Sequence, residues 1–146
     1  MATFLFKTEP SEFSFDDLAK AGPSFWDGVK NPQALIHLRT IRPGDEVLIY
    51  HTGNDKAIVG LARAESGPVA DPKNPGMNDR GEPRFAVVKL TAVGRFPSPV
   101  ELGRIKADAR FADFGLIRQG RLSVMPVPPA LDRILRSWTG EPIRLR

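Results

Sequence analysis

A chain of 146 residues with 41% hydrophobic and 26% charged residues has the size and composition of one compact domain. It contains no cysteine, which excludes disulfide bonds and thiol catalysis. No apolar run approaches the ~18 residues of a membrane span, and the first residues lack the pattern of a signal peptide. We therefore expect a cytoplasmic protein with a single domain over residues 1–146.

Positive charge is concentrated in the second half of the chain. Residues 1–73 carry 8 Lys and Arg against 10 Asp and Glu, whereas residues 74–146 carry 13 against 7. Of those 13 cations, 11 are arginines, whose planar guanidinium suits phosphate oxygens and base edges. The basic half indicates either a polyanionic partner or merely a solvated basic face.

The first predicted elements are short. Residues 3–8 (TFLFKT) predict a strand, and residues 14–22 predict a helix with Ser14 as its N-cap. Residues 31–41 predict a second helix, because Pro32 suits a first helical position and apolar residues recur at helical spacing.

Between these two helices lies FWDGVKNPQA (residues 25–34). A tryptophan that only fills a core usually has apolar neighbours, but Trp26 adjoins an Asp-Gly pair, which is turn chemistry. Amide side chains follow within a few residues, at Asn31 and Gln33. The segment predicts an aromatic face beside hydrogen-bonding groups at the start of a helix.

The middle of the chain predicts strands and one long loop. Strands are expected at residues 42–52, 56–66 and 84–96, and Gly60 within the second indicates a close backbone approach or a bulge. Residues 67–83 are rich in Pro, Gly, Asn and Asp, and a loop of that length is usually functional or mobile.

The remaining pattern predicts a helix at 100–107, a strand at 121–127 and an amphipathic helix at 128–138. Five or six strands mixed with short helices, without regular βαβ alternation, indicate the α+β class. The expected form is a small curved sheet or barrel with helices at its ends.

The sequence lacks the common signatures of catalysis and of cofactor binding. It has no Gly-rich phosphate loop and no nucleophile elbow. The two histidines, His37 and His51, are too few for a zinc site. We therefore expect no cofactor, no metal and no catalytic residue.

Four segments in register resemble the signatures of the EVE domain family: KTEP (7–10), FWDGVKNPQA (25–34), IYHT (49–52) and RLSVMPV (121–127). The resemblance implies a PUA-like mixed-sheet pseudo-barrel with short peripheral helices. It also implies a module that takes a flipped, often modified, base of DNA or RNA into an aromatic pocket. The matching positions that would contact the nucleic acid are Lys7, Thr8, Trp26, Asn31, Gln33, His51, Thr52, Arg121 and Ser123.

Within this resemblance, Trp26 would be the wall on which a base stacks. The two amides of the 31–41 helix would read a Watson–Crick edge. Lys7 and its neighbour would present donors, and His51 and its neighbour would line the same mouth. Arg121 and Ser123, one pleat apart on the predicted strand, would hold backbone or base oxygen.

The sequence departs from the family pattern where many relatives carry a second tryptophan, because that region here is Arg84-Phe85. Phe85, Met77 or Pro72 is the candidate for the second pocket wall. A loss of that wall would change the preference for modified bases.

Several structural interpretations compete with these roles. Trp26 is also a plausible half-buried core residue, Asn31 a simple N-cap, and His51 a strand-end histidine with satisfied hydrogen bonds. Lys7 and Arg121 are also ordinary surface cations. Two other functions remain open, namely a small-molecule or nucleotide-derivative enzyme on the same fold and a protein-interaction module that uses the basic half.

Overall fold

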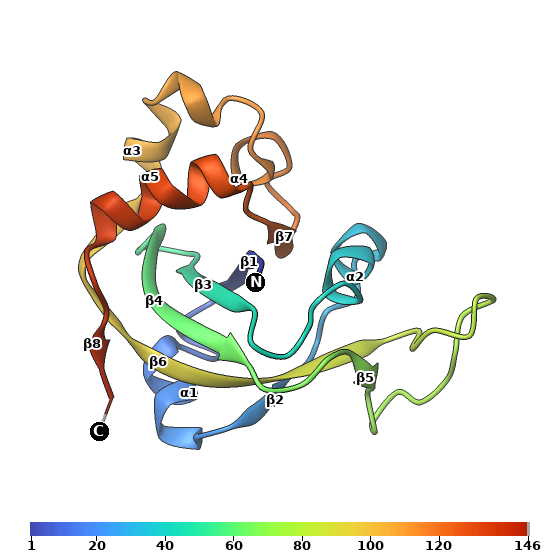
Figure 1. The fold of residues 1–146 in the computed structure, drawn as a ribbon. Helices are drawn as coiled ribbons and strands as arrows, with labels where there is room; N and C mark the ends of the chain where they lie inside the picture. The colour runs from blue at the N-terminus through green and yellow to red at the C-terminus, as the bar shows by residue number, and fades with distance from the viewer. Residues whose placement is uncertain (146) are drawn as a thin grey trace.

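The computed structural model describes residues 1–145 and consists of a curled, mixed β-sheet with short helices around it (Figure 1). Over these residues the sheet has eight strands: β1 (Thr3–Thr8), β2 (Ser24–Trp26), β3 (Glu46–His51), β4 (Ala57–Ala64), β5 (Val69–Ala70), β6 (Ala86–Glu101), β7 (Val124–Pro126) and β8 (Ile143–Arg144). The helices are α1 (Phe15–Ala21), α2 (Pro32–Leu38), α3 (Leu102–Lys106), α4 (Gly115–Arg118) and α5 (Pro129–Thr139), with a 3₁₀ turn, η1, at Ala109–Phe111. The predicted α+β class is confirmed.

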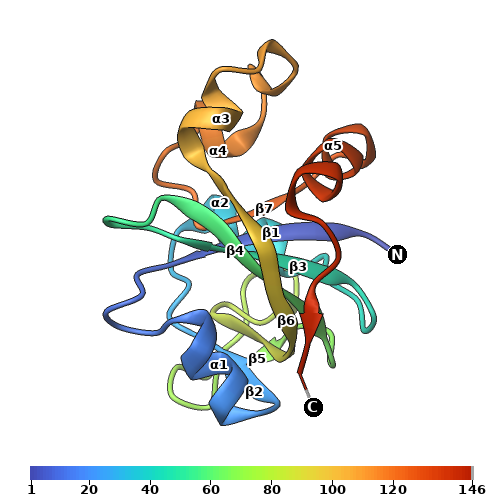
Figure 2. The same cartoon turned by 90° about the vertical axis from the view of Figure 1, so that its left-hand side faces the viewer.

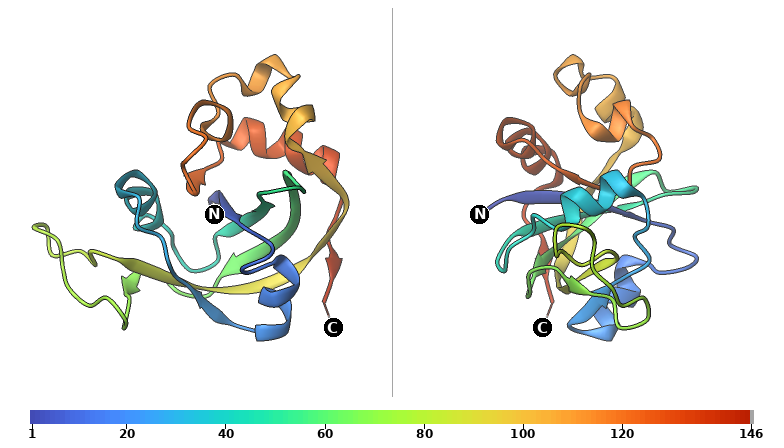
Figure 3. Two further views of the ribbon diagram at one scale, coloured as in Figure 1. Left: turned by 180° about the vertical axis from the view of Figure 1, so that it is seen from behind. Right: turned by 90° about the vertical axis from the view of Figure 1, so that its right-hand side faces the viewer.

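The long strand β6 organises the sheet. The strand order is β2-β6-β4-β3-β1-β7, and β5 and β8 also pair with β6. β1 and β3 are parallel, with Thr8 opposite His51, whereas the other strand pairs among residues 1–145 are antiparallel. Figures 2 and 3 show the resulting curl from three further directions. The sheet is a half-barrel, as the resemblance implied.

Shifts of register bend the central strands. The β3–β4 ladder shifts after Ile49, and the β4–β6 ladder shifts before Gly60 and after Leu61. Such bulges increase the local twist and let a sheet curve. A Cβ on Gly60 would lie 2.5 Å from the ring of Phe15. Of the two alternatives predicted for Gly60, the structure shows the bulge, and the close neighbour is the ring of Phe15, the first residue of α1.

The core lies inside the curl, and helices cover its open sides. α5 packs across one end with Leu135 fully buried, and Leu131, Ile134 and Trp138 pack beside it. This confirms the amphipathic helix predicted at 128–138. Over residues 1–145, none of the helices combines the length and the apolar character that a membrane crossing requires.

Local chemistry defines the first two helices. Ser14 and Asp17 form a capping box at α1, with the Ser14 hydroxyl accepting from the Asp17 amide at 3.0 Å. At α2, the Asn31 side chain accepts from the amides of Gln33 and Ala34 at 2.9 and 3.1 Å. Both predicted N-termini are confirmed, although α2 ends at Leu38, earlier than predicted.

β6 is longer than the predicted strand at 84–96, since it continues through Pro97 and Pro99 to Glu101. Proline normally interrupts a ladder because it has no amide hydrogen. Here the β4–β6 ladder jumps from Arg95 to Val100, so the two prolines lie where no ladder donor is needed. The helix predicted at 100–107 consequently begins only at residue 102.

The strand predicted at 121–127 is shorter than expected. β7 covers only Val124–Pro126, and the preceding residues form a turn, with the Leu122 amide bonded to the Gln119 carbonyl. The prediction that Arg121 and Ser123 share one face of a strand is therefore wrong. The short strands β2, β5 and β8, the 3₁₀ turn η1 and the short helix α4 were not predicted.

Candidate functional site

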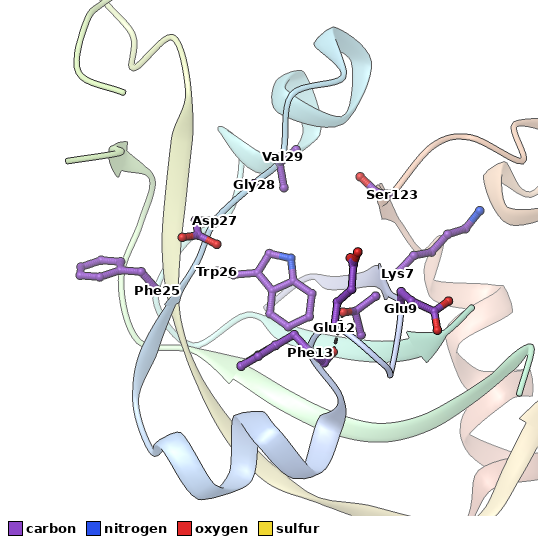
Figure 4. Close-up of a pocket in the computed structure, with 11 residues that line it drawn as sticks. Lys7, Glu9, Glu12, Phe13, Phe25, Trp26, Asp27, Gly28, Val29 and Ser123 are labelled. Atoms are coloured by element: carbon purple, nitrogen blue, oxygen red, sulfur yellow. Dashed lines mark hydrogen bonds between the residues drawn. The ribbon is translucent and has the colours of Figure 1, made fainter. Parts of the chain in front are cut away.

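A cavity of about 380 Å³ opens where the end of β1 and the turn after it face β2 (Figure 4). Pockets for small ligands have volumes of about 300–1,000 Å³, so this cavity is large enough for one. Three segments that are distant in sequence form its walls: Lys7, Thr8, Glu9, Glu12 and Phe13; Phe25, Trp26, Asp27, Gly28 and Val29; and Ser123.

Trp26 forms the inner wall of the cavity. It ends β2, opposite Val88 of β6, and its side chain is only 8% exposed. Its ring lies 5.6 Å from that of Phe6 and 5.8 Å from that of Phe13, measured between ring centroids. Trp26 is thus a buried core residue, more buried than expected, and it also lines the cavity. Its role as the surface on which a base stacks stays a prediction.

Phe13 is the second aromatic wall, and its ring meets Trp26 edge-on at 77°. The Thr8 hydroxyl donates to the Phe13 carbonyl at 2.6 Å, and the Phe13 amide donates to the Glu9 carbonyl at 2.9 Å. Thr8 thus holds the turn that carries Phe13. The ring of Phe25, which is half exposed, points away from Trp26 in Figure 4.

Lys7 lines one side of the cavity, but its ammonium group binds elsewhere. Its Nζ donates to the Gly120 carbonyl at 2.8 Å, and partial burial lowers the pKa of Lys7. The backbone amide of Lys7 donates to the Ser123 carbonyl at 2.9 Å. This bond brings Ser123 to the cavity, although Ser123 lies outside β7.

A hydrogen bond between Thr52 and Glu9 connects the end of β3 to the turn after β1, beside the cavity. The Thr52 hydroxyl donates to Glu9 Oε2 at 3.0 Å, and Ser11 donates to Glu9 Oε1. These hydrogen bonds, led by the one from Thr52, lower the pKa of Glu9. Thr52 does not line the cavity and instead faces the hollow next to it.

His51 does not reach the cavity. It is buried, its Nε2 accepts from the Phe15 amide at 3.0 Å, and its Nδ1 lies 2.9 Å from an Asp55 carboxylate oxygen. Both ring nitrogens are therefore engaged, and the residue connects β3 to the start of α1. The structure favours the strand-end interpretation of His51 over a position at the pocket mouth.

The two amides predicted to read a base edge are also outside the cavity. Asn31 uses its carbonyl oxygen to cap α2, and Gln33 Nε2 lies 3.1 Å from His37 Nε2. Both side chains are exposed. Their sequence proximity to Trp26 does not bring them to its ring, because the turn through Gly28, with a φ of +78°, redirects the chain.

The other predicted contacts lie apart from the cavity as well. Arg121 is exposed and does not line it, and neither Phe85 nor Met77 nor Pro72 forms its second wall. Phe85 lines a different hollow and has the Arg84 guanidinium 5.5 Å from its ring centre. Met77 lies in the long loop, where it forms an isolated β-bridge with Pro83, and it is 61% exposed.

Sequence reasoning missed Glu12, Phe13 and Asp27 as lining residues. Glu12 and Phe13 follow directly after the KTEP segment, and they reach the cavity because the turn after β1 folds back on itself. Asp27 follows Trp26 and was interpreted only as turn chemistry. Nothing in the composition or spacing distinguishes these three from ordinary turn residues.

A second hollow, of about 240 Å³, adjoins the cavity on the far side of Lys7. Three lysines that are distant in sequence line it: Lys7 of β1, Lys56 just before β4 and Lys106 of α3. The cavity beside Trp26 has the opposite character, since carboxylates outnumber its one lysine. The charges that line the first space therefore repel anions, whereas those that line the second attract them.

The fold and the cavity define a PUA-like half-barrel domain with a ligand-sized space between β1 and β2. The chain belongs to the EVE domain family, whose model matches residues 2–137. This confirms the resemblance drawn from the four segments.

Known proteins of similar sequence and fold agree with this assignment. Thymocyte nuclear protein 1 of Gallus gallus is 29% identical over 153 residues, which cover 85% of this chain and 63% of the relative, so the chain spans less than two thirds of that protein. A structure from Rhodopseudomonas palustris has a TM-score of 0.84 at 33% identity and covers 96% of this chain and 94% of its own. Human THYN1 protein, in complex with DNA containing 5-methylcytosine, has a similar fold: its TM-score is 0.80 at 24% identity, with 97% and 100% of the two chains covered.

Proposed function

We propose that this domain binds nucleic acid and accepts one flipped, modified base in the cavity between Trp26 and Lys7. The observation that carries the proposal is the cavity itself, which is lined by two aromatic rings and has a volume suited to one planar ligand. Stacking of a base on an aromatic side chain contributes about 1–3 kcal/mol. The fold likeness to human THYN1, which was crystallised with DNA containing 5-methylcytosine, supports this choice of ligand.

The phosphates of the bound strand would lie outside the cavity. Its carboxylates repel phosphate, whereas Lys56 and Lys106 line the adjoining hollow. If one base of a nucleic-acid strand enters the cavity beside Trp26, the sugar-phosphate backbone of that strand would therefore run past Lys7 towards these lysines. Such contacts release counterions, so the affinity falls as the salt concentration rises.

This role is one of binding rather than of catalysis. The alternative enzyme would use Lys7, Glu9 or His51 as its acid–base group. The Lys7 ammonium donates to the Gly120 carbonyl, and the Glu9 carboxylate accepts from Thr52 and Ser11. His51 is buried with both nitrogens engaged, so the arrangement favours binding over this alternative. Extruding a base costs a few kcal/mol and is least costly when the base is unpaired or modified. The domain should prefer single strands and modified duplexes.

The test is the affinity for single-stranded oligonucleotides that differ only in one 5-methylcytosine. Alanine at Trp26 would leave a void beside Phe6 and cost roughly 3–5 kcal/mol of stability, so Trp26→Leu is the better variant. We expect Trp26→Leu to weaken binding about tenfold or more, because it removes the stacking surface. Trp26→Phe should recover part of that loss. Fluorescence anisotropy at two salt concentrations measures both effects.

Trp138→Leu is the matched control, because Trp138 is half-buried against Phe111 and Arg104 and does not line the cavity. We expect this variant to bind as the wild type does. Thermal unfolding shows whether each variant is folded. A folded Trp26→Leu variant with wild-type affinity would contradict the proposed function.

A further inference from the structure

Glu12 differs from the other acidic groups of the cavity. Its side chain lines the cavity, and its carboxylate has no hydrogen-bond or ion-pair partner within residues 1–145. Figure 4 shows this carboxylate pointing into the space between Trp26 and Ser123. The turn that carries it is held by the bond from the Glu12 amide to the Glu9 carbonyl at 2.9 Å. The cavity therefore holds a positioned hydrogen-bond acceptor that the fold does not use.

The neighbouring charged groups are engaged elsewhere. Glu9 accepts from Thr52 and Ser11 with its two oxygens. Asp27 is half-exposed at the rim, 3.9 Å from the ammonium group of Lys73. The ammonium of Lys7 is bound to a backbone carbonyl. Of the acidic groups that line the cavity, Glu12 is the one whose carboxylate has neither a hydrogen bond nor an ion pair among residues 1–145, and it points into the space beside Trp26.

Two donors without partners among residues 1–145 face the same space. They are the indole Nε1–H of Trp26 and the hydroxyl of Ser123, both shown in Figure 4. A carboxylate beside these donors complements a ring edge on which an amino group adjoins an acceptor. That arrangement occurs at N4 and N3 of cytosine and at N6 and N1 of adenine.

We infer that Glu12 determines base specificity by accepting a hydrogen bond from the exocyclic amino group of the flipped base. The inference rests on the proposed function and names the ligand class: bases with an amino group next to a ring acceptor. The corresponding keto bases, thymine and hypoxanthine, would place a carbonyl oxygen against the carboxylate. Two facing acceptors cannot form a hydrogen bond, so a keto base loses this contact and meets a like partial charge instead.

The test compares pairs of single-stranded oligonucleotides that differ at one central position. 5-Methylcytosine and thymine share the ring and the methyl group and differ in the amino or keto group, as do adenine and hypoxanthine. We expect the wild-type domain to prefer the amino base on the order of tenfold in at least one pair. The pair with the larger preference shows whether the cavity takes a pyrimidine or a purine.

Glu12→Gln should reduce this preference towards unity, because an amide can rotate to donate to a keto oxygen or to accept from an amino group. Glu12 is exposed on a turn, so this change leaves the fold intact. Glu65→Gln is the control, because it removes the same charge at a side chain that pairs with Arg63 outside the cavity. This variant should keep the wild-type preference.

The outcomes separate the inference from the proposed function. Binding that needs Trp26 but shows no preference in either pair overturns the role of Glu12 and leaves the binding function standing. A preference that survives in Glu12→Gln also overturns it. If the wild-type domain binds none of the oligonucleotides, both the function and the inference fail.

Discussion

The residues of this site divide into those that present polar or aromatic groups to the cavity and those that hold its walls in place. Trp26, Glu12 and Ser123 present free groups to the cavity. Thr8 and His51 use their polar atoms within the protein, on the Phe13 carbonyl and on the Phe15 amide. A change at Thr8 or His51 would therefore act on binding through the position of the turn between β1 and α1.

Asp108 gives a prediction for stability at low pH. Its carboxylate accepts from the Arg110 guanidinium at 3.0 and 2.7 Å and from the Arg110 amide at 3.0 Å, which lowers its pKa from 3.8 to about 2. Because the folded state favours the ionised form, this contribution is complete above about pH 4 and is lost as the pH falls through about 2. We expect Asp108→Asn to flatten the fall in unfolding free energy over that range.

Urea unfolding followed at intervals between pH 2 and 5 measures this effect. Asp113→Asn is the matched control, since the Asp113 side chain is 96% exposed and makes one contact with Arg118. If the unfolding free energy of Asp108→Asn falls with decreasing pH as steeply as that of the wild type, the hydrogen bonds between Asp108 and Arg110 do not stabilise the fold.

The roles of individual residues were predictable only in part, for a physical reason. The chemistry around Trp26 and the capping of α2 by Asn31 are local, so the sequence displays them. The separation of Asn31 from the Trp26 ring depends on the direction of the chain after Gly28, which is a tertiary property. Phe13 and Glu12 reach the cavity only because the turn after β1 folds back, and no periodic pattern marks such a turn.

Among the elements, β6 sets the shape of the molecule. It pairs with β2 and β5 near its start and with β4 and β8 further along. The long elements were predictable because their apolar patterns are strong. β2, β5 and β8 have only two or three residues each, and their pairing with β6 alone defines them as strands.

Gly94 of β6 gives a prediction at this scale. It lies opposite Arg144 of β8, and a Cβ on Gly94 would collide with the carbonyl of Ile143. We expect Gly94→Ala to displace β8, because backbone atoms cannot move aside as a side chain can. The Leu145 amide, which bonds to the Val93 carbonyl at 3.0 Å, should then exchange its hydrogen faster. Hydrogen exchange followed by NMR measures this.

Gly103→Ala is the control for that experiment. Gly103 lies in α3 and a Cβ there would have open space, so the exchange of the Leu145 amide should be unchanged. Unaltered protection of Leu145 in Gly94→Ala would show that β8 tolerates the larger residue.

At the scale of the whole molecule, the half-barrel brings β1, β2 and the segment before β7 together around one cavity. The basic second half of the chain contributes Lys106 to the hollow next to that cavity, whereas the predicted contact Arg121 lies apart. The excess of positive charge in the second half of the chain therefore does not locate the lysine-lined hollow, because folding places Lys7 and Lys56 of the first half beside Lys106.

The two tryptophans of the chain allow a direct test of the central claim, which is that a base stacks on Trp26. In Trp138→Phe, Trp26 is the sole tryptophan, so the indole emission reports on the cavity alone. Titration with a single strand that carries one 5-methylcytosine should quench this emission and saturate at the concentration where anisotropy shows binding. Binding with unchanged Trp26 emission would contradict the account.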